Sequence, residues 1–178
     1  DRVVNDLKVP KTSFKATDII VMCAPVISAD GLHKFRRVTS ITEVRKKWED
    51  DPLAEGAFVD LMRYNAKKDT LEPTQELING ESDIIKSIGA NVREWVGNWD
   101  AMWENIVLRG ELKRLLVEYT TKLHMPQLLE AEFSSAANDA YYRIAESMQT
   151  EIGTLDSKRI ALEWEEWLKR ELRKKQLQ

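Results

Sequence analysis

Residues 19–44 read IIVMCAPVISADGLHKFRRVTSITEV, and this stretch decides how the N-terminal part of the chain folds. Residues 19–26 are a nearly continuous apolar run rich in β-branched side chains, which is typical of a buried strand. Asp30-Gly31 is a turn signal, and residues 35–44 then alternate between two faces with the period of a strand. The stretch therefore predicts an antiparallel hairpin whose first strand is buried.

A second hairpin is predicted downstream. Its first strand covers residues 57–64 (AFVDLMRY), its turn residues 65–68 (NAKK) and its short return strand residues 69–72. Residues 48–56 (WEDDPLAEG) would form the loop that joins the two hairpins.

The apolar pattern changes near residue 75 from a period of 2 to a helical period. Helices are predicted over residues 81–95, 99–124 and 126–152, and a last helix would begin after Thr154 or Asp156. Ser82 favours the start of the first helix and Gly153 the end of the third. The predicted fold is α+β: a strand-rich domain over residues 1–74, with strands confined to 17–73, and a bundle of about four helices over 75–178.

The composition limits the classes of protein to consider. Of the 178 residues 43% are hydrophobic, which suffices for a core, and the net charge of −3 gives no reason to expect nucleic acid as a partner. No apolar run approaches the ~20 residues that a membrane-spanning helix requires, so we expect no direct membrane span.

Cys23 is the only cysteine, so no internal disulfide can form, which fits a reducing cytoplasm. Because Cys23 lies within the apolar run, we expect its thiol to be buried and unreactive.

The residue sets that carry catalysis are missing. The sequence has only 7 glycines and no G-x-x-x-x-G-K-[ST], the loop whose backbone N–H groups and lysine hold phosphates. His33 and His124 are the only histidines, and neither has a second ligand at metal-binding spacing. We therefore assign no catalytic, cofactor-binding or metal-binding residue to this chain.

Three tryptophans suggest an interaction surface. Trp95, Trp99 and Trp103 lie at positions i, i+4 and i+8, so one continuous helix would present all three on one face. Such a face is a candidate docking surface, because Trp often anchors interfaces. The alternative is that these rings pack between helices, as large aromatic side chains usually do.

Arg36 and Arg37 are the other candidate interaction residues. In an assembly they would face a neighbouring subunit or a phosphate group. Strand alternation sends adjacent side chains to opposite faces, so the two arginines are not expected to act as one cluster. The alternative is that they are solvated charges at the edge of a strand.

Several phrases occur in an order that resembles a known family. These are R-x-x-N-x-x-x-x-P at 2–10, D-I-I-V at 18–21, R-R-V-x-x-I-x-E-V at 36–44 and F-x-x-x-x-x-Y-N-x-x-x-D-x-L at 58–71, followed by Ser82, Ile84, Ile85, Ile88 and Arg109. The set resembles the end of the motor domain of the type II/type IV secretion-system ATPases, in particular the archaeal pilus and archaellum members. The resemblance covers residues 1–120, and residues 126–178 match only loosely.

The resemblance implies a place in a larger machine. Members of the family are hexameric ATPases with a RecA-like core, and their ATP- and Mg²⁺-binding motifs would precede Asp1. The chain would then be a C-terminal region that transmits nucleotide-driven motion and contacts ring neighbours or a membrane platform protein, in the cytoplasm. In isolation, the strand at 19–26 would lack a partner strand, so we expect self-association. The alternative is a stand-alone α+β protein-interaction module without motor activity.

Overall fold

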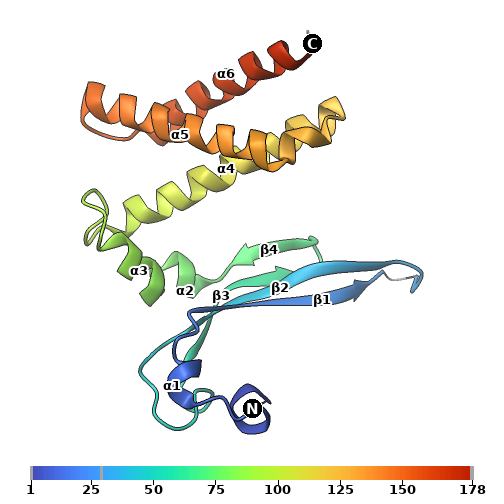
Figure 1. The fold of residues 1–178 in the computed structure, drawn as a ribbon, viewed down its shortest axis with the longest axis vertical. Helices are drawn as coiled ribbons and strands as arrows, with labels where there is room; N and C mark the ends of the chain where they lie inside the picture. The colour runs from blue at the N-terminus through green and yellow to red at the C-terminus, as the bar shows by residue number, and fades with distance from the viewer. Residues whose placement is uncertain (1, 29, 177–178) are drawn as a thin grey trace. The chain divides into compact units, whose positions relative to one another are not determined.

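The computed structural model describes residues 2–28 and 30–176 and has the predicted α+β fold (Figure 1). The chain divides into two compact units, Asp1–Trp99 and Asp100–Gln178, called here the sheet unit and the helical unit. The predicted division at residue 75 marks the change from strands to helices, since the last described strand ends at Pro73. The compact units divide later along the chain, because the short helices after that strand pack with the sheet.

The sheet unit contains an antiparallel sheet with the order β1-β2-β3-β4. Its strands are β1 (Ile19–Ile27), β2 (Lys34–Val44), β3 (Phe58–Asn65) and β4 (Thr70–Pro73). Both predicted hairpins are confirmed, and all the described strands fall within residues 17–73 as predicted.

The first hairpin turn follows the sequence signal. The Ser28 backbone N–H donates to the His33 carbonyl over 3.0 Å, and an Asp30 carboxylate oxygen accepts from the Leu32 N–H over 2.9 Å. Gly31 has a φ of 71°, which favours glycine because it has no Cβ. The turn thereby aligns Ile27 with Lys34 and sets the register of the hairpin.

The exposure of β1 differs from the prediction of a buried strand. Its side chains are half-buried or exposed, and Cys23 is exposed, so the prediction of a buried thiol is wrong. The physical reason is that β1 lies at the edge of the sheet and contacts mainly β2, so that other described elements cover little of either face. Composition alone did not distinguish such an edge strand from a central one.

The sheet unit also contains short helices. Two precede β1: a π-helical turn at Arg2–Asp6 and α1 (Lys11–Phe14), neither of which the sequence pattern predicted. The Phe14 ring makes edge contacts with the rings of Trp48 and Phe58, at centroid distances of 6.1 and 6.4 Å. These aromatic contacts anchor the loop after β2, because Trp48 is almost fully buried.

Two capped helices follow β4, α2 (Gln75–Ile78) and α3 (Asp83–Gly89). The hydroxyl of Ser82 accepts from the Ile85 N–H at the start of α3, so the predicted Ser82 cap is confirmed. The prediction of a helix over 81–95 is wrong in extent. After Gly89 the backbone N–H groups bond three residues back, from Asn91 to Ile88 for example, and the chain passes into turns.

A buried carboxylate ties α3 to the sheet. Glu43, on β2, is fully buried and accepts from the Ser82 hydroxyl over 2.5 Å and from the Asp83 N–H over 2.9 Å. Burying a carboxylate without hydrogen-bond donors costs folding free energy. The two bonds to Glu43 therefore fix the position at which the chain leaves the sheet.

Within the helical unit α4 (Trp99–Leu123), α5 (Ala131–Ile152) and α6 (Ser157–Gln176) pack around one core. The predicted helix over 126–152 is interrupted: Pro126–Leu129 is a 3₁₀ turn, and Glu130 is extended before α5 begins. Gly153 ends α5 with a φ of 74°, as predicted. Of the two residues proposed to start α6, Thr154 and Asp156, it is the Asp156 carboxylate that caps the helix, by accepting from the N–H of Lys158 and Arg159. The core consists of Leu108, Leu112, Leu116, Leu128, Phe133, Ala137, Ala140, Tyr141, Met148, Ile160, Trp164, Leu168 and Leu172.

Hydrogen bonds cross this core and hold the helices together. The Tyr119 hydroxyl on α4 donates to a Glu165 carboxylate oxygen on α6 over 2.8 Å. This hydrogen bond raises the pKa of Tyr119 and lowers that of Glu165. The buried Trp164 indole N–H donates to the Ala137 carbonyl over 2.8 Å, which links α6 to α5.

Candidate interaction surfaces

The outer edge of β1 is the first candidate surface. β2 pairs with β1 along its whole length, from Ile19 to Ile27, and in the described part of the chain no strand pairs with the other side. An unpaired strand edge offers backbone N–H and C=O groups to another strand.

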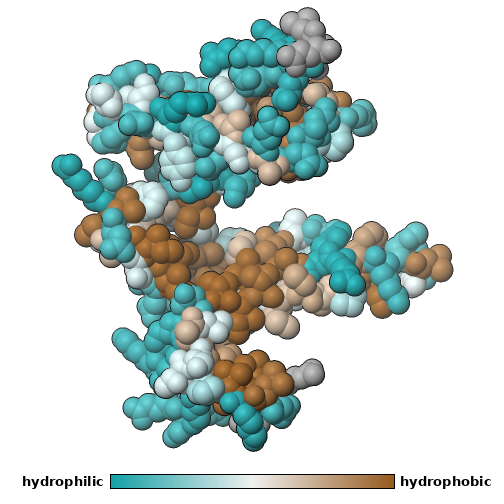
Figure 2. Space-filling model, viewed as in Figure 1, coloured by the Kyte–Doolittle hydropathy of each residue, from teal (hydrophilic) through white to brown (hydrophobic). Residues whose placement is uncertain are grey.

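Apolar side chains accompany this edge. Those exposed on the first hairpin are Ile19, Val21, Met22, Ile27, Leu32 and Phe35. Figure 2 shows brown, apolar atoms gathered over the part of the view in which Figure 1 draws the sheet. We call these six exposed side chains, together with the unpaired edge of β1, the β1 edge surface. Apolar side chains around an unpaired edge are typical of a surface that is covered in an assembly.

The two candidate arginines have different surroundings. Arg37 forms a bidentate pair with Asp69 in the second hairpin turn, with both N···O distances 2.7 Å. The Tyr64 hydroxyl also donates to Asp69, over 2.6 Å. The Arg37 guanidinium, followed by the Tyr64 hydroxyl, holds the pKa of the Asp69 carboxyl far below its ordinary value.

The Arg36 side chain is exposed and makes no bond to Asp69, although the Arg36 carbonyl accepts from the Arg37 guanidinium over 3.1 Å. The structure therefore separates the two arginines, as strand alternation predicted. Arg37 has a structural partner that ties the first hairpin to the second, whereas a role in contacts with another subunit stays a prediction for both.

The three candidate tryptophans do not share one helix. Gly97, with a φ of 69°, separates Trp95 from α4, which begins at Trp99. The prediction of one continuous face is therefore wrong for Trp95, because a left-handed residue interrupts the helical path. Trp95, Trp99 and Trp103 are each half-buried.

Trp99 has a defined packing role in the sheet unit. Its indole N–H donates to the Ile78 carbonyl over 2.9 Å, and its ring covers Gly80 so closely that a Cβ there would stand 2.7 Å from the ring. Trp164 and Trp167 also pack in the core, with the Trp167 ring 5.9 Å from that of Phe133. Packing between elements therefore accounts for these rings, and docking through Trp95 and Trp103 stays a prediction.

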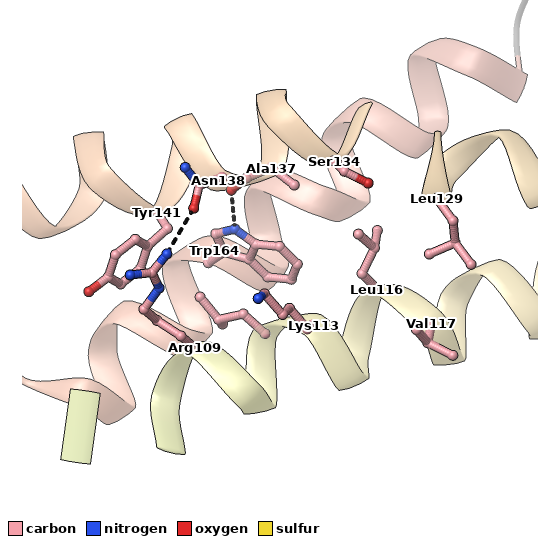
Figure 3. A pocket seen from close by; sticks show the side chains of 11 residues that line it. Arg109, Lys113, Leu116, Val117, Leu129, Ser134, Ala137, Asn138, Tyr141 and Trp164 are labelled. Carbon is pink, nitrogen blue, oxygen red and sulfur yellow. Dashed lines mark hydrogen bonds between the residues drawn. The ribbon is translucent and has the colours of Figure 1, made fainter. Parts of the chain in front are cut away.

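A groove between α4 and α5 is the surface that sequence reasoning missed. Its cavity measures about 290 Å³ and is lined by Arg109, Leu112, Lys113, Leu116, Val117, Leu129, Ser134, Ala137, Asn138, Tyr141 and Trp164. Figure 3 shows Arg109 and Tyr141 at one end, Trp164 in the middle and Leu129 with Val117 at the other end. The groove therefore has a cationic end and an apolar end.

One sequence signal was available for this groove. The helix predicted over 126–152 contains Ala137, whose small side chain leaves space in the groove beside larger neighbours. The pattern did not show that α4 would leave that space open, because this depends on how far apart the helices lie.

Two further properties concern the described residues as a whole. Within 2–28 and 30–176, no three His, Cys, Asp or Glu side chains gather as metal ligands would. Across the same residues no helix combines the length and apolar character needed to cross a bilayer.

Sequence comparison does not assign this chain to a family. No family model matches it, and no curated protein matches it significantly.

Proposed function

We propose that this chain is the C-terminal region of a hexameric ATPase of the secretion and pilus-assembly type. The sheet unit would complete the motor sheet of the parent protein. The helical unit would contact neighbouring subunits or a membrane platform protein and transmit nucleotide-driven motion to them. The place of action would be the cytoplasm, at the membrane through these partners.

The observation that carries the proposal is the β1 edge surface. β1 presents an unpaired edge with Val21 and Met22 both more than half exposed, and a strand that continues a larger sheet would have these features. The family-like phrases support the same interpretation, since 36–44 lies on β2 and 58–71 spans β3, the turn after it and the start of β4. ATP and Mg²⁺ would bind upstream of this region.

The reading frame upstream of the Asp1 codon tests the proposal. We expect an in-frame G-x-x-x-x-G-K-[ST], and ATP hydrolysis by the encoded protein that is lost when the loop lysine is replaced by alanine. The 178-residue chain alone should bind no Mg-ATP in calorimetry up to millimolar nucleotide, because it has no phosphate-binding loop. A start codon directly before Asp1 would contradict the proposal.

The alternative function is a stand-alone interaction module. It is favoured by one observation, that the helical unit has a continuous core of its own. Under this alternative, the 178-residue chain alone should bind its partner, whereas the motor proposal requires the chain together with its upstream motor sequence. Co-purification with the two versions of the chain would distinguish them.

A further inference from the structure

We propose that the groove between α4 and α5 binds a single-chain amphiphile with an anionic head group. The head would lie at Arg109 and Lys113, and the alkyl chain would run past Trp164 toward Leu129. The inference uses the helical unit alone, so it does not depend on the motor proposal.

The depth of the groove favours a narrow apolar ligand. Its floor is formed by Leu112, Leu116, Ala137, Tyr141 and Trp164, whose exposed fractions are only 2–7%. A partner helix is about 10–12 Å wide with its side chains, so it would reach the floor only through separate side chains and not along its length. A single alkyl chain is thin enough to enter and contact these side chains.

The length of the groove limits the length of the ligand's alkyl chain. From Arg109 to Val117 the lining follows α4 for about 12 Å, at about 1.5 Å per residue. An extended ligand of roughly eight to ten carbons, its head-group carbon included, has this length, given carbon–carbon bonds of about 1.5 Å. At the far end Val117 and Leu129 are 49% and 48% exposed, so the terminal methyl group would cover apolar surface that is otherwise in water.

The charges of the groove favour an anion. Arg109 and Lys113 line it, and no Asp or Glu is among the lining residues. Neither cation has a carboxylate partner within the described residues; Arg109 donates to the Asn138 side-chain oxygen over 3.3 Å and lies over the rings of Tyr141 and Tyr142. An anionic head would supply the missing partner, and its attraction would be strengthened beside the buried floor.

A second hollow of the helical unit provides a contrast. It measures about 400 Å³, and its lining includes Arg143, Arg170, Glu163 and Glu166, so positive and negative side chains occur together. Size alone would favour this hollow. Its two positive and two negative side chains balance, so it favours neither an anion nor a cation. It also has no deep apolar floor comparable to that of the groove.

The test uses the whole 178-residue chain and three ligands with the same ten-carbon tail. Calorimetry below the micelle concentration should give saturable 1:1 binding of decanoate. Decanol and decyltrimethylammonium should bind at least tenfold more weakly, because they lack the anion. Equal binding of all three ligands, or no saturable decanoate binding, would overturn the proposal.

Variants locate the site. Lys113→Gln should weaken decanoate binding. The double variant that adds Arg109→Gln should weaken it by at least tenfold. Ser134→Leu should abolish binding by filling the groove from the half-buried rim of α5. Arg143→Gln in the second hollow is the matched control and should bind normally. Circular dichroism checks that each variant is folded, and unchanged affinity in folded Ser134→Leu would refute the assignment.

Two further ligands identify the source of the alkyl chain. Binding to anionic vesicles that is lost in Ser134→Leu would support the site and assign the ligand to a membrane lipid. If vesicles do not bind while decanoate does, a free fatty acid is supported. An acidic amphipathic helical peptide that binds in place of decanoate would overturn the proposal.

Discussion

The sheet unit and the helical unit differ in how they satisfy their apolar side chains. The helical unit buries Leu128, Ile160 and Leu168 almost completely in one core. The sheet unit buries Trp48 and Val44 but leaves Val21, Met22 and Ile27 more than half exposed on β1. The helical unit therefore has a closed core, whereas the sheet unit presents an apolar edge that an assembly would cover.

Leu168→Ala tests the closed core and should have the largest effect. Leu168 is fully buried, so its truncation should lower the free energy of unfolding of the helical unit by about 2–5 kcal/mol. Leu162→Ala on the same helix is the control, because that side chain is 65% exposed. Hydrogen exchange followed segment by segment during urea unfolding measures both. Equal effects of the two substitutions would contradict a closed core around α6.

Gly80→Ala tests the close contact between Gly80 and the Trp99 ring in the sheet unit. A new Cβ would meet the Trp99 ring at 2.7 Å, and Gly80 also has a φ of 78°. We expect a loss of about 1–3 kcal/mol of unfolding free energy, from the left-handed backbone together with overpacking.

Gly56→Ala isolates the backbone part of that loss. Gly56 has a φ of 66° and nothing within 4 Å of the added Cβ. The difference between the two variants in urea unfolding therefore measures the Trp99 contact. A Gly56→Ala loss as large as that of Gly80→Ala would show that the contact contributes nothing.

Val21→Lys tests the open edge. We predict that the isolated chain self-associates through β1, and a lysine on the edge should weaken this association by roughly tenfold, or about 1.4 kcal/mol. Light scattering over a range of concentrations measures it. Leu162→Lys, an exposed position on α6, should leave association unchanged. A wild-type chain that stays monomeric with protected amides at 19–26 would refute the prediction.

The Arg37–Asp69 pair should give the smallest effect, because both side chains are partly exposed. The native pKa of Asp69 is lowered by Arg37 and then Tyr64, from an ordinary value of 3.8. Its stabilising contribution is therefore complete above that value and is lost as the pH falls toward the depressed native pKa. NMR titration should show Arg37→Gln raising the Asp69 pKa, and an unchanged pKa would contradict the pairing.

The sequence by itself determined the local elements. Asp30-Gly31 set the first hairpin turn, Ser82 and Asp156 capped their helices, and Gly153 ended α5. These signals are readable because each depends on backbone dihedrals and hydrogen bonds within a few residues. The α+β order followed from them.

Tertiary structure decided which surfaces are covered. The apolar run of β1 gave no sign that Cys23 would be exposed, and the tryptophan spacing gave none that Gly97 would separate Trp95 from α4. The Glu43–Ser82 bond and the groove beside Ala137 join residues far apart in the chain. Burial, buried polar pairs and cavities arise from the separation of packed elements, and periodicity along one element carries no information about that separation.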